Sequence, residues 1–119
     1  MSARIDRAAL QRCAGVNVRR TDRVLTQFYD KMLAPSGVSG SQFGVLAAIS
    51  ESSPVSIQGL ARRLGADRTT LTRGLESLVS HHLIRFEEGD DRRMRLVRLT
   101  LGGERALRLA WPLWQAAQA

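Results

Sequence analysis

The feature that most constrains the fold is a pair of short helical patterns that meet at a glycine. Residues 57–64 carry apolar side chains at helical spacing, and the pattern stops at Gly65. Glycine readily adopts positive φ, which allows a sharp turn between two helices. A second helical pattern covers residues 67–82. Its inner side is a stripe of Leu71, Leu75, Leu78 and His82, which Val79 widens. A helix, a tight turn and a second helix are therefore predicted in direct succession.

Two strand-like segments follow the second helix. Apolar residues alternate in residues 83–88 and again in residues 94–100, as expected for half-buried strands. The turn between them has an acidic-basic sequence, Gly89-Asp90-Asp91-Arg92-Arg93. The order helix, turn, helix, hairpin predicts a mainly α winged helix-turn-helix fold with a two-stranded wing.

Long helices are predicted on both sides of this segment. Residues 7–34 form one helix with an apolar stripe of Leu10, Ala14, Val18, Leu25, Phe28 and Met32, and Ala34-Pro35-Ser36-Gly37 ends it. The next helix begins near Ser39, which has capping-box spacing to Gln42, and ends at Ser52-Ser53-Pro54. Its predicted inner face contains Phe43, Leu46 and Ala47, with Ser50 at the margin.

Capping residues also define the remaining helices. Ser56 is predicted to cap residues 57–64, and Thr100 to cap a last helix over residues 101–119. Pro112 is expected to kink that last helix near Arg108. The 119 residues are enough for one domain with a core.

The charge balance favours an anionic partner. The formal net charge is +7 with a sequence pI near 11.3, and every basic residue except Lys31 is arginine. Arginine suits phosphates and guanine edges, although a basic balance also suits RNA or anionic membranes. With one cysteine, Cys13, a disulfide framework is excluded. No signal-peptide core or membrane-length apolar stretch is present, so we expect a cytoplasmic protein without a membrane partner.

The outer side of the second helix is the first candidate binding surface. It presents medium-length donors and acceptors near the helix N-terminus, as major-groove recognition requires: Arg68, Thr69, Thr70, Thr72 and Arg73. Arg73 could contact guanine O6 and N7 together. At the wing, Arg92 and Arg93 suit the minor groove, and Asp91 could hold Arg93 extended. The alternatives are an ordinary solvated helix face and an ordinary charged hairpin.

These residues resemble the MarR family of bacterial regulators. The resemblance rests on Asp67-Arg68-Thr69-Thr70-Leu71-Thr72-Arg73, then Leu78-Val79, and then the segment from Asp91 to Gly103. In that last segment the family's wing signature, D-x-R followed by V-x-L-T-x-x-G, falls on Asp91, Arg93, Val97, Leu99, Thr100 and Gly103. Together with the order of the preceding helices, the resemblance extends over about residues 7–119.

The resemblance implies a homodimeric transcription factor, usually a repressor, that leaves a near-palindromic double-stranded operator when a small molecule binds or a cysteine is oxidised. Residues 7–34 and 101–119 would be dimerisation helices, and residues 39–100 a DNA-binding lobe. By position, the same helix and wing residues become the DNA contacts. Family members usually continue through a longer fifth helix and a sixth, whereas this sequence ends at Ala119. It is therefore either a shortened version or one whose dimer is built differently.

Regulatory sites are also implied by the resemblance. It places a pocket for a small aromatic or phenolic effector between the dimerisation helices and the lobe. The candidates are Phe28, Tyr29, Phe43 and Trp111, with Arg19 or Arg20 to meet a carboxylate. The alternative is that these aromatic residues only pack in the core. Cys13 could be a redox sensor, which requires thiolate character and access to oxidant; a small buried apolar side chain is the favoured alternative.

Other function classes have little support in the sequence. His81 and His82 are adjacent and point about 100° apart on a helix, so a zinc site is not expected. No nucleophile-elbow, phosphate-binding glycine loop or paired-acid pattern points to an enzyme, and no cofactor is expected. The rival interpretations are a winged helix used for protein docking and a module that binds nucleic acid without sequence preference.

Overall fold

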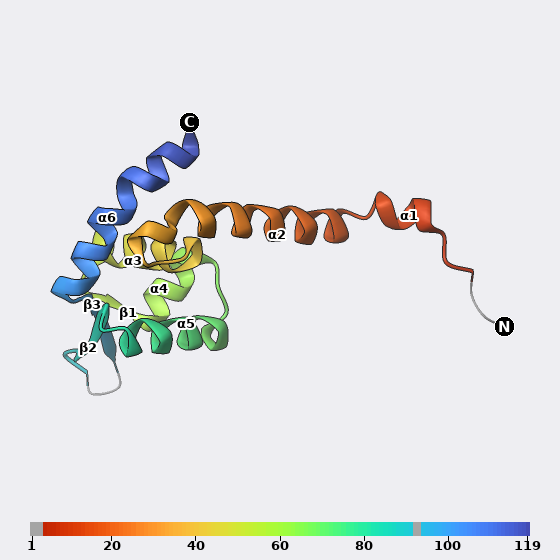
Figure 1. Ribbon diagram of the computed structural model, residues 1–119. Coiled ribbons are helices and arrows are strands. Elements are labelled where there is room, and N and C mark those ends of the chain that lie inside the picture. Colours follow the sequence, from red (N-terminus) through yellow and green to blue (C-terminus); the bar gives the residue numbers. More distant parts are fainter. Residues whose placement is uncertain (1–3, 92–93) are drawn as a thin grey trace.

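The computed structural model describes residues 4–91 and 94–119. Its order is α1 (Arg7–Gln11), α2 (Ala14–Leu33), a 3-10 turn η1 (Ala34–Ser36), α3 (Gly40–Ser52), β1 (Val55–Ser56), α4 (Ile57–Leu64), α5 (Arg68–Ser80), β2 (Ile84–Glu88), β3 (Arg95–Leu99) and α6 (Leu101–Gln118). A body of helices and a small sheet carries α2 as a projecting arm, with α1 at its far end (Figure 1). The predicted mainly α winged helix-turn-helix is confirmed.

The prediction of one helix over residues 7–34 is wrong, because the helix is interrupted after Gln11. Cys13 is extended, with φ −69° and ψ 118°, and serves as the N-cap residue of α2. The Asn17 side-chain amide donates to the Gln11 carbonyl over 2.9 Å, which satisfies one carbonyl at the end of α1. Apolar spacing continues across the break, so periodicity alone could not reveal it. The predicted helix end at Ala34-Pro35-Ser36-Gly37 is confirmed within one residue, since α2 ends at Leu33 and Gly37 has φ 81°.

The apolar stripe of α2 is not covered by the rest of the chain. Val18 is 65% exposed and Phe28 is 45% exposed, and Leu33 is the only buried residue of this helix. Figure 1 shows why, since most of α2 extends beyond the body. A helix that buries so little of its apolar side lacks the packing that normally stabilises helices in proteins.

Helix α3 begins as predicted, but its buried face differs. Ser39 Oγ accepts from Gln42 N over 3.1 Å, and Gln42 Oε1 accepts from Ser39 N over 2.9 Å, so the capping box is complete. The buried residues are Phe43, Leu46, Ala48 and Ile49, whereas Ala47 is half-buried and Ser50 is exposed. Both α2 and α6 contact α3, and the sheet does so as well. With neighbours on several sides, the buried surface is wider than a single helical stripe.

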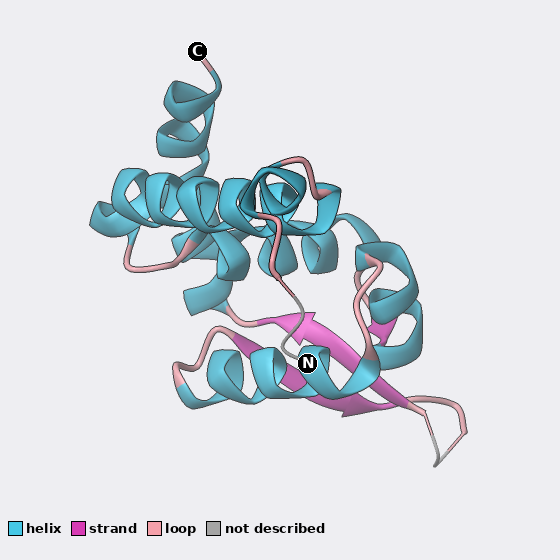
Figure 2. Cartoon of the chain, turned by 90° about the vertical axis from the view of Figure 1, so that its right-hand side faces the viewer, coloured by secondary structure: helices cyan, strands magenta, loops and turns pink. Residues whose placement is uncertain are grey.

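The sheet has three strands in the order β1-β3-β2, all antiparallel. Sequence analysis predicted β2 and β3 and missed β1, whose two residues pair with Leu96 and Val97. Figure 2 shows the β2–β3 hairpin reaching past the helices. Ile84 and Val97 are buried, and Phe86 packs against the core from the same face. The wing is therefore anchored at its base by apolar packing.

Helix α6 begins at the predicted cap and returns along α2 and α3. Thr100 Oγ1 accepts from Gly103 N over 3.0 Å, and the helix continues through Pro112. Gly103, Ala106 and Ala110 are its buried residues, and the two alanines belong to the hydrophobic core. No single helix in the described ranges is long and apolar enough to cross a membrane; α2 with η1 and α3 meets that criterion only as a pair bent by 70°.

Candidate nucleic-acid interface

The helix-turn-helix is fixed by a capping residue and a left-handed glycine. Ser56 Oγ accepts from Gly59 N over 2.9 Å at the start of α4. Gly65 has φ 63° and its N–H donates to carbonyls of the last turn of α4. Leu60 is fully buried between the helices and the sheet. The turn therefore holds α5 at a defined angle against the core, as the sequence predicted.

Helix α5 buries one side and exposes the other. Leu71, Leu75 and Leu78 are at most 4% exposed. The predicted recognition residues all lie on the exposed side: Arg68, Thr69, Thr70, Thr72 and Arg73. His82 was predicted on the inner side, which is wrong: α5 ends at Ser80, and His82 is exposed with φ 59°. The helix thus offers a polar face that no segment of the described chain covers.

Asp67 organises the first turn of this face. Its carboxylate accepts from Thr70 N over 2.9 Å and from Thr70 Oγ1 over 2.7 Å. These two hydrogen bonds to the charged form hold the pKa of Asp67 below its ordinary value of 3.8. Thr72 Oγ1 donates to the Arg68 carbonyl over 2.7 Å. Thr70 and Thr72 therefore have their hydroxyl protons engaged, and they present oxygen lone pairs and methyl groups to a partner.

The lowered pKa of Asp67 predicts how stability depends on pH. The cap stabilises the folded chain when the carboxylate is ionised, so its contribution is present above the ordinary aspartate pKa. It is lost as the pH falls through the lower folded-state pKa. We expect Asp67→Asn to keep a cap oxygen and to show a weaker fall in melting temperature below about pH 4. If the melting temperatures of the wild type and Asp67→Asn fall equally steeply with pH in the acid range, Asp67 does not have this role.

The wing carries a basic residue that sequence analysis did not select. The guanidinium carbon of Arg95 lies 5.4 Å from the centroid of the Phe86 ring, a cation–π contact that orients an exposed arginine near the tip. Near the tip, Gly89 N donates to the Met94 carbonyl and Met94 N donates to the Asp91 carbonyl, each over 2.8 Å. Asp91, predicted to support Arg93, is exposed, while Arg92 and Arg93 lie outside the described residues.

Three of the predicted effector residues come together. Tyr29, Phe43 and Trp111 line one cavity of about 880 Å³ between α2, α3 and α6. Trp114, which sequence analysis missed, also lines it and stacks with Trp111 at a centroid distance of 5.2 Å. Its position three residues after Trp111, on the same side of a helix, was the available signal.

Contacts around Tyr29 define that cavity further. Gln118 Nε2 donates to Tyr29 Oη over 2.7 Å and ties the end of α6 to α2. Phe28 packs edge-on against Tyr29 but does not line the cavity, and neither do Arg19 and Arg20. The charged residues in its wall are Asp22 and Glu51. The cavity therefore presents aromatic rings and carboxylates, without the predicted arginine.

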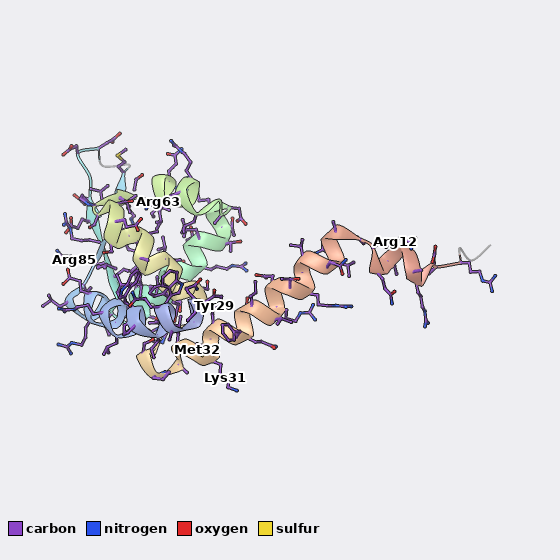
Figure 3. All side chains as sticks on the ribbon, turned by 90° about the horizontal axis from the view of Figure 1, so that it is seen from above. Arg12, Tyr29, Lys31, Met32, Arg63 and Arg85 are labelled. Carbon is purple, nitrogen blue, oxygen red and sulfur yellow. The ribbon has the colours of Figure 1, made fainter. Side chains whose placement is uncertain are left out.

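Cys13 is exposed, so its favoured interpretation as a buried apolar side chain is wrong. It lies between α1 and α2, where the main chain is extended and the side chain has little to pack against. Figure 3 shows the neighbouring Arg12 at the far end of the arm, away from the body. Among the described residues, no group of three or more His, Cys, Asp or Glu could hold a metal ion.

Comparison with known families and structures decides the identity of the fold. Residues 36–94 match the model of the MarR family. The chain is 44% identical to MosR, a transcriptional regulator of M. tuberculosis solved in complex with DNA, with a TM-score of 0.84; the match covers 90% of this chain and 78% of MosR. The chain belongs to the MarR family. The family resemblance predicted from the recognition helix and wing is thus confirmed.

Two further solved structures share the MarR-family fold seen here. The C80S mutant of MarR from E. coli, complexed with operator DNA, is 26% identical with a TM-score of 0.80, and the match covers 87% of this chain and 76% of that one. PcaV from Streptomyces coelicolor, solved with its natural ligand, is 23% identical with a TM-score of 0.82, over 98% of this chain and 81% of PcaV. No curated protein sequence gave a significant match.

Proposed function

We propose that this MarR-family regulator binds double-stranded operator DNA through α5 and the wing. The observation that carries the proposal is the polar face of α5, which is exposed along its arginine and threonine residues while the opposite side is buried. Arg68, Thr69 and Arg73 project where a helix in the major groove contacts bases and phosphates. The hairpin would then reach the adjacent minor groove, where Arg95 is exposed near the tip. The sequence-predicted wing contacts Arg92 and Arg93 lie outside the described residues. We expect no enzymatic activity.

Two solved complexes support this proposal. MosR, at 44% identity, was solved with DNA, and the E. coli MarR mutant was solved with its operator. Both match this chain over most of its length. If this chain shares the recognition helix and wing of those proteins, it would dock on a DNA duplex in the same way. A regulator of this kind would act in the cytoplasm.

A homodimer would place two recognition helices on one operator. The apolar residues of α2 are uncovered in a single chain, and α6 likewise exposes Leu109 (55%) and Trp111 (48%). Residues 7–34 and 101–119 would pair with a second copy and bury these side chains, while residues 39–100 form the DNA-binding lobe. Two such lobes related by a twofold axis fit a near-palindromic site with half-sites about one helical turn apart.

A salt titration separates this function from its rivals. We expect labelled operator to bind much more tightly than random duplex of equal length, with both affinities falling as salt rises. A protein-docking module predicts no selective component at any salt concentration. A module without sequence preference predicts the same affinity for both duplexes. Either result would overturn the proposed function.

Gly74 gives a matched test of close approach to DNA. It lies in the middle of α5, and a Cβ added there meets nothing within 4 Å. Gly74→Ala should therefore stabilise the chain by about 0.5–1 kcal/mol. If the glycine is there to let DNA approach the helix, the same substitution should weaken operator binding. Gly44→Ala, also in an open helix position, serves as the control and should stabilise without changing DNA affinity.

Repression would be released by an effector in the aromatic cavity or by oxidation of Cys13. The sequence has only two tryptophans, Trp111 and Trp114, and both line that cavity. Intrinsic fluorescence therefore reports on its occupancy. We expect a small aromatic or phenolic effector to quench this fluorescence saturably and to release operator DNA over the same concentration range. Quenching by effectors without any release of DNA would remove this cavity from the regulatory account.

A further inference from the structure

A second cavity lies at the base of the wing. It measures about 700 Å³ and lies between the end of α3, strands β2 and β3, and the first turns of α6. The polar residues of its wall are Arg85, Arg98, Arg108, Ser50, Ser53, Thr100 and Glu104. Figure 3 shows Arg85 on the side of the body away from the α2 arm. We call this the arginine cavity.

The arginines in this cavity are incompletely neutralised. Arg85 and Arg98 lie directly opposite each other on β2 and β3. One oxygen, Glu87 Oε1, lies 3.1 Å from an Arg85 terminal nitrogen and 2.9 Å from Arg98 Nε. The Arg98 Nε is buried and this ion pair gives it no hydrogen bond. The wall holds three arginines, Arg85, Arg98 and Arg108, and one glutamate, Glu104. When Glu87, which pairs with Arg85 and Arg98, is counted as well, an excess of one positive formal charge remains.

The start of α6 adds a further positive contribution. Leu101 lines the cavity, and it occupies the first position of an 18-residue helix. The first amides of an α-helix have no intrahelical acceptor, and the helix dipole makes this end partly positive. Gly103 N already donates to Thr100 Oγ1 and Glu104 N to the Thr100 carbonyl, so the amides of Leu101 and Gly102 are the ones offered to a ligand. Guanidinium forks, serine hydroxyls and helix amides are all donors, and together they match the acceptor oxygens of a carboxylate or phosphate.

The cavity lies at the base of the hairpin and not at its tip. Arg85 and Arg98 lie next to the Ile84–Leu99 pair at the base of the hairpin, whereas the tip lies between Gly89 and Met94. A group bound at the base would thus not compete directly with DNA at the tip.

We propose that the arginine cavity is an oxyanion-binding site that takes a carboxylate or phosphate group. The group could be free or the head of a larger molecule. A neighbouring apolar depression shares Ser50, Leu107 and Arg108 with the arginine cavity and continues to Trp111. The apolar body of a larger ligand would follow this shared wall.

The test is an NMR titration of the full chain with inorganic phosphate at constant ionic strength. Saturable shifts are expected at the amides of residues 101–104 and at the side chains of Arg85 and Arg98. Arg108→Gln removes a donor from an exposed position, so the fold is retained, and it should weaken phosphate binding about tenfold. Arg105→Gln is the matched control, because Arg105 is exposed on the same helix outside the cavity, and it should bind as the wild type does.

Three results would overturn the proposed site. They are chemical-shift changes that do not saturate with phosphate, changes centred on α5, and an equal loss of phosphate affinity in Arg108→Gln and Arg105→Gln. A second titration with phenyl phosphate distinguishes the two sources of the oxyanion. If phenyl phosphate binds more tightly than inorganic phosphate, with its shifts still centred on residues 101–104, and Leu107→Ala removes this gain, the oxyanion is the head group of a larger ligand. Leu107 lines both the arginine cavity and the apolar depression but not the aromatic cavity. Equal affinity for the two phosphates indicates a free oxyanion.

Discussion

Arg73→Ala is expected to raise the Kd for the operator about 10- to 100-fold and to relax the preference at one base position. This corresponds to about 1–3 kcal/mol, the usual value of one bidentate contact between an arginine and guanine. Arg73 is exposed, and no ion pair involves it within residues 4–91 and 94–119. Its loss should therefore leave the melting temperature nearly unchanged, so that the effect on binding is not an effect on folding.

The control for Arg73→Ala is Arg105→Ala, which removes the same charge from an exposed position on α6. It should lower the affinity for operator and random duplex slightly and by the same factor, because it removes one positive charge from the sequence-independent attraction to DNA phosphates. Competition binding with operator variants at the affected position measures the relaxed preference. If Arg73→Ala weakens operator and random DNA by the same factor, this arginine contacts only phosphates.

Gly103→Ala is expected to destabilise the fold by about 3 kcal/mol, at the upper end of the cost of overpacking. A Cβ at Gly103 would lie 2.0 Å from the Leu83 carbonyl oxygen, which belongs to the main chain and cannot rotate away. The first turn of α6 would have to move off the base of the wing. Because α6 carries the residues proposed for dimerisation, operator affinity should fall as well.

Denaturant unfolding of Gly103→Ala beside Gly44→Ala measures this effect. Gly44 is a helix position with open space around an added Cβ, so alanine there should stabilise the chain slightly. Because the two substitutions should change the free energy of unfolding in opposite directions, their comparison isolates the steric cost of the added Cβ at Gly103. An unfolding free energy for Gly103→Ala equal to that of the wild type would show that α6 does not lie this close to Leu83.

Local patterns predicted the DNA-facing part of the molecule well. Helix starts are marked by the capping residues Ser39, Ser56 and Thr100. Each hydroxyl oxygen accepts a hydrogen bond from the backbone amide three residues later. Gly65 marks the turn because it takes a left-handed conformation. Exposure of the α5 polar face follows from the spacing of its leucines, and all of these features depend on contacts that are near in sequence.

Features that depend on contacts between residues distant in sequence were either missed or predicted wrongly. Strand β1 exists only because it pairs with β3, about forty residues later, and two residues carry no strand pattern. Ala48 and Ile49 are buried because α3 has several neighbours, which its own periodicity does not reveal. The exposure of Cys13 follows from a helix break that apolar spacing conceals. Trp114 joins the aromatic cavity through tertiary packing of α6 against α3.

The most direct test of DNA recognition by α5 and the wing is a selection of bound sequences from a pool of random duplex DNA. The account predicts enrichment of one near-palindromic motif with half-sites about one helical turn apart, and loss of one base preference per half-site for Arg73→Ala. A pool that shows no enriched motif after selection would contradict it.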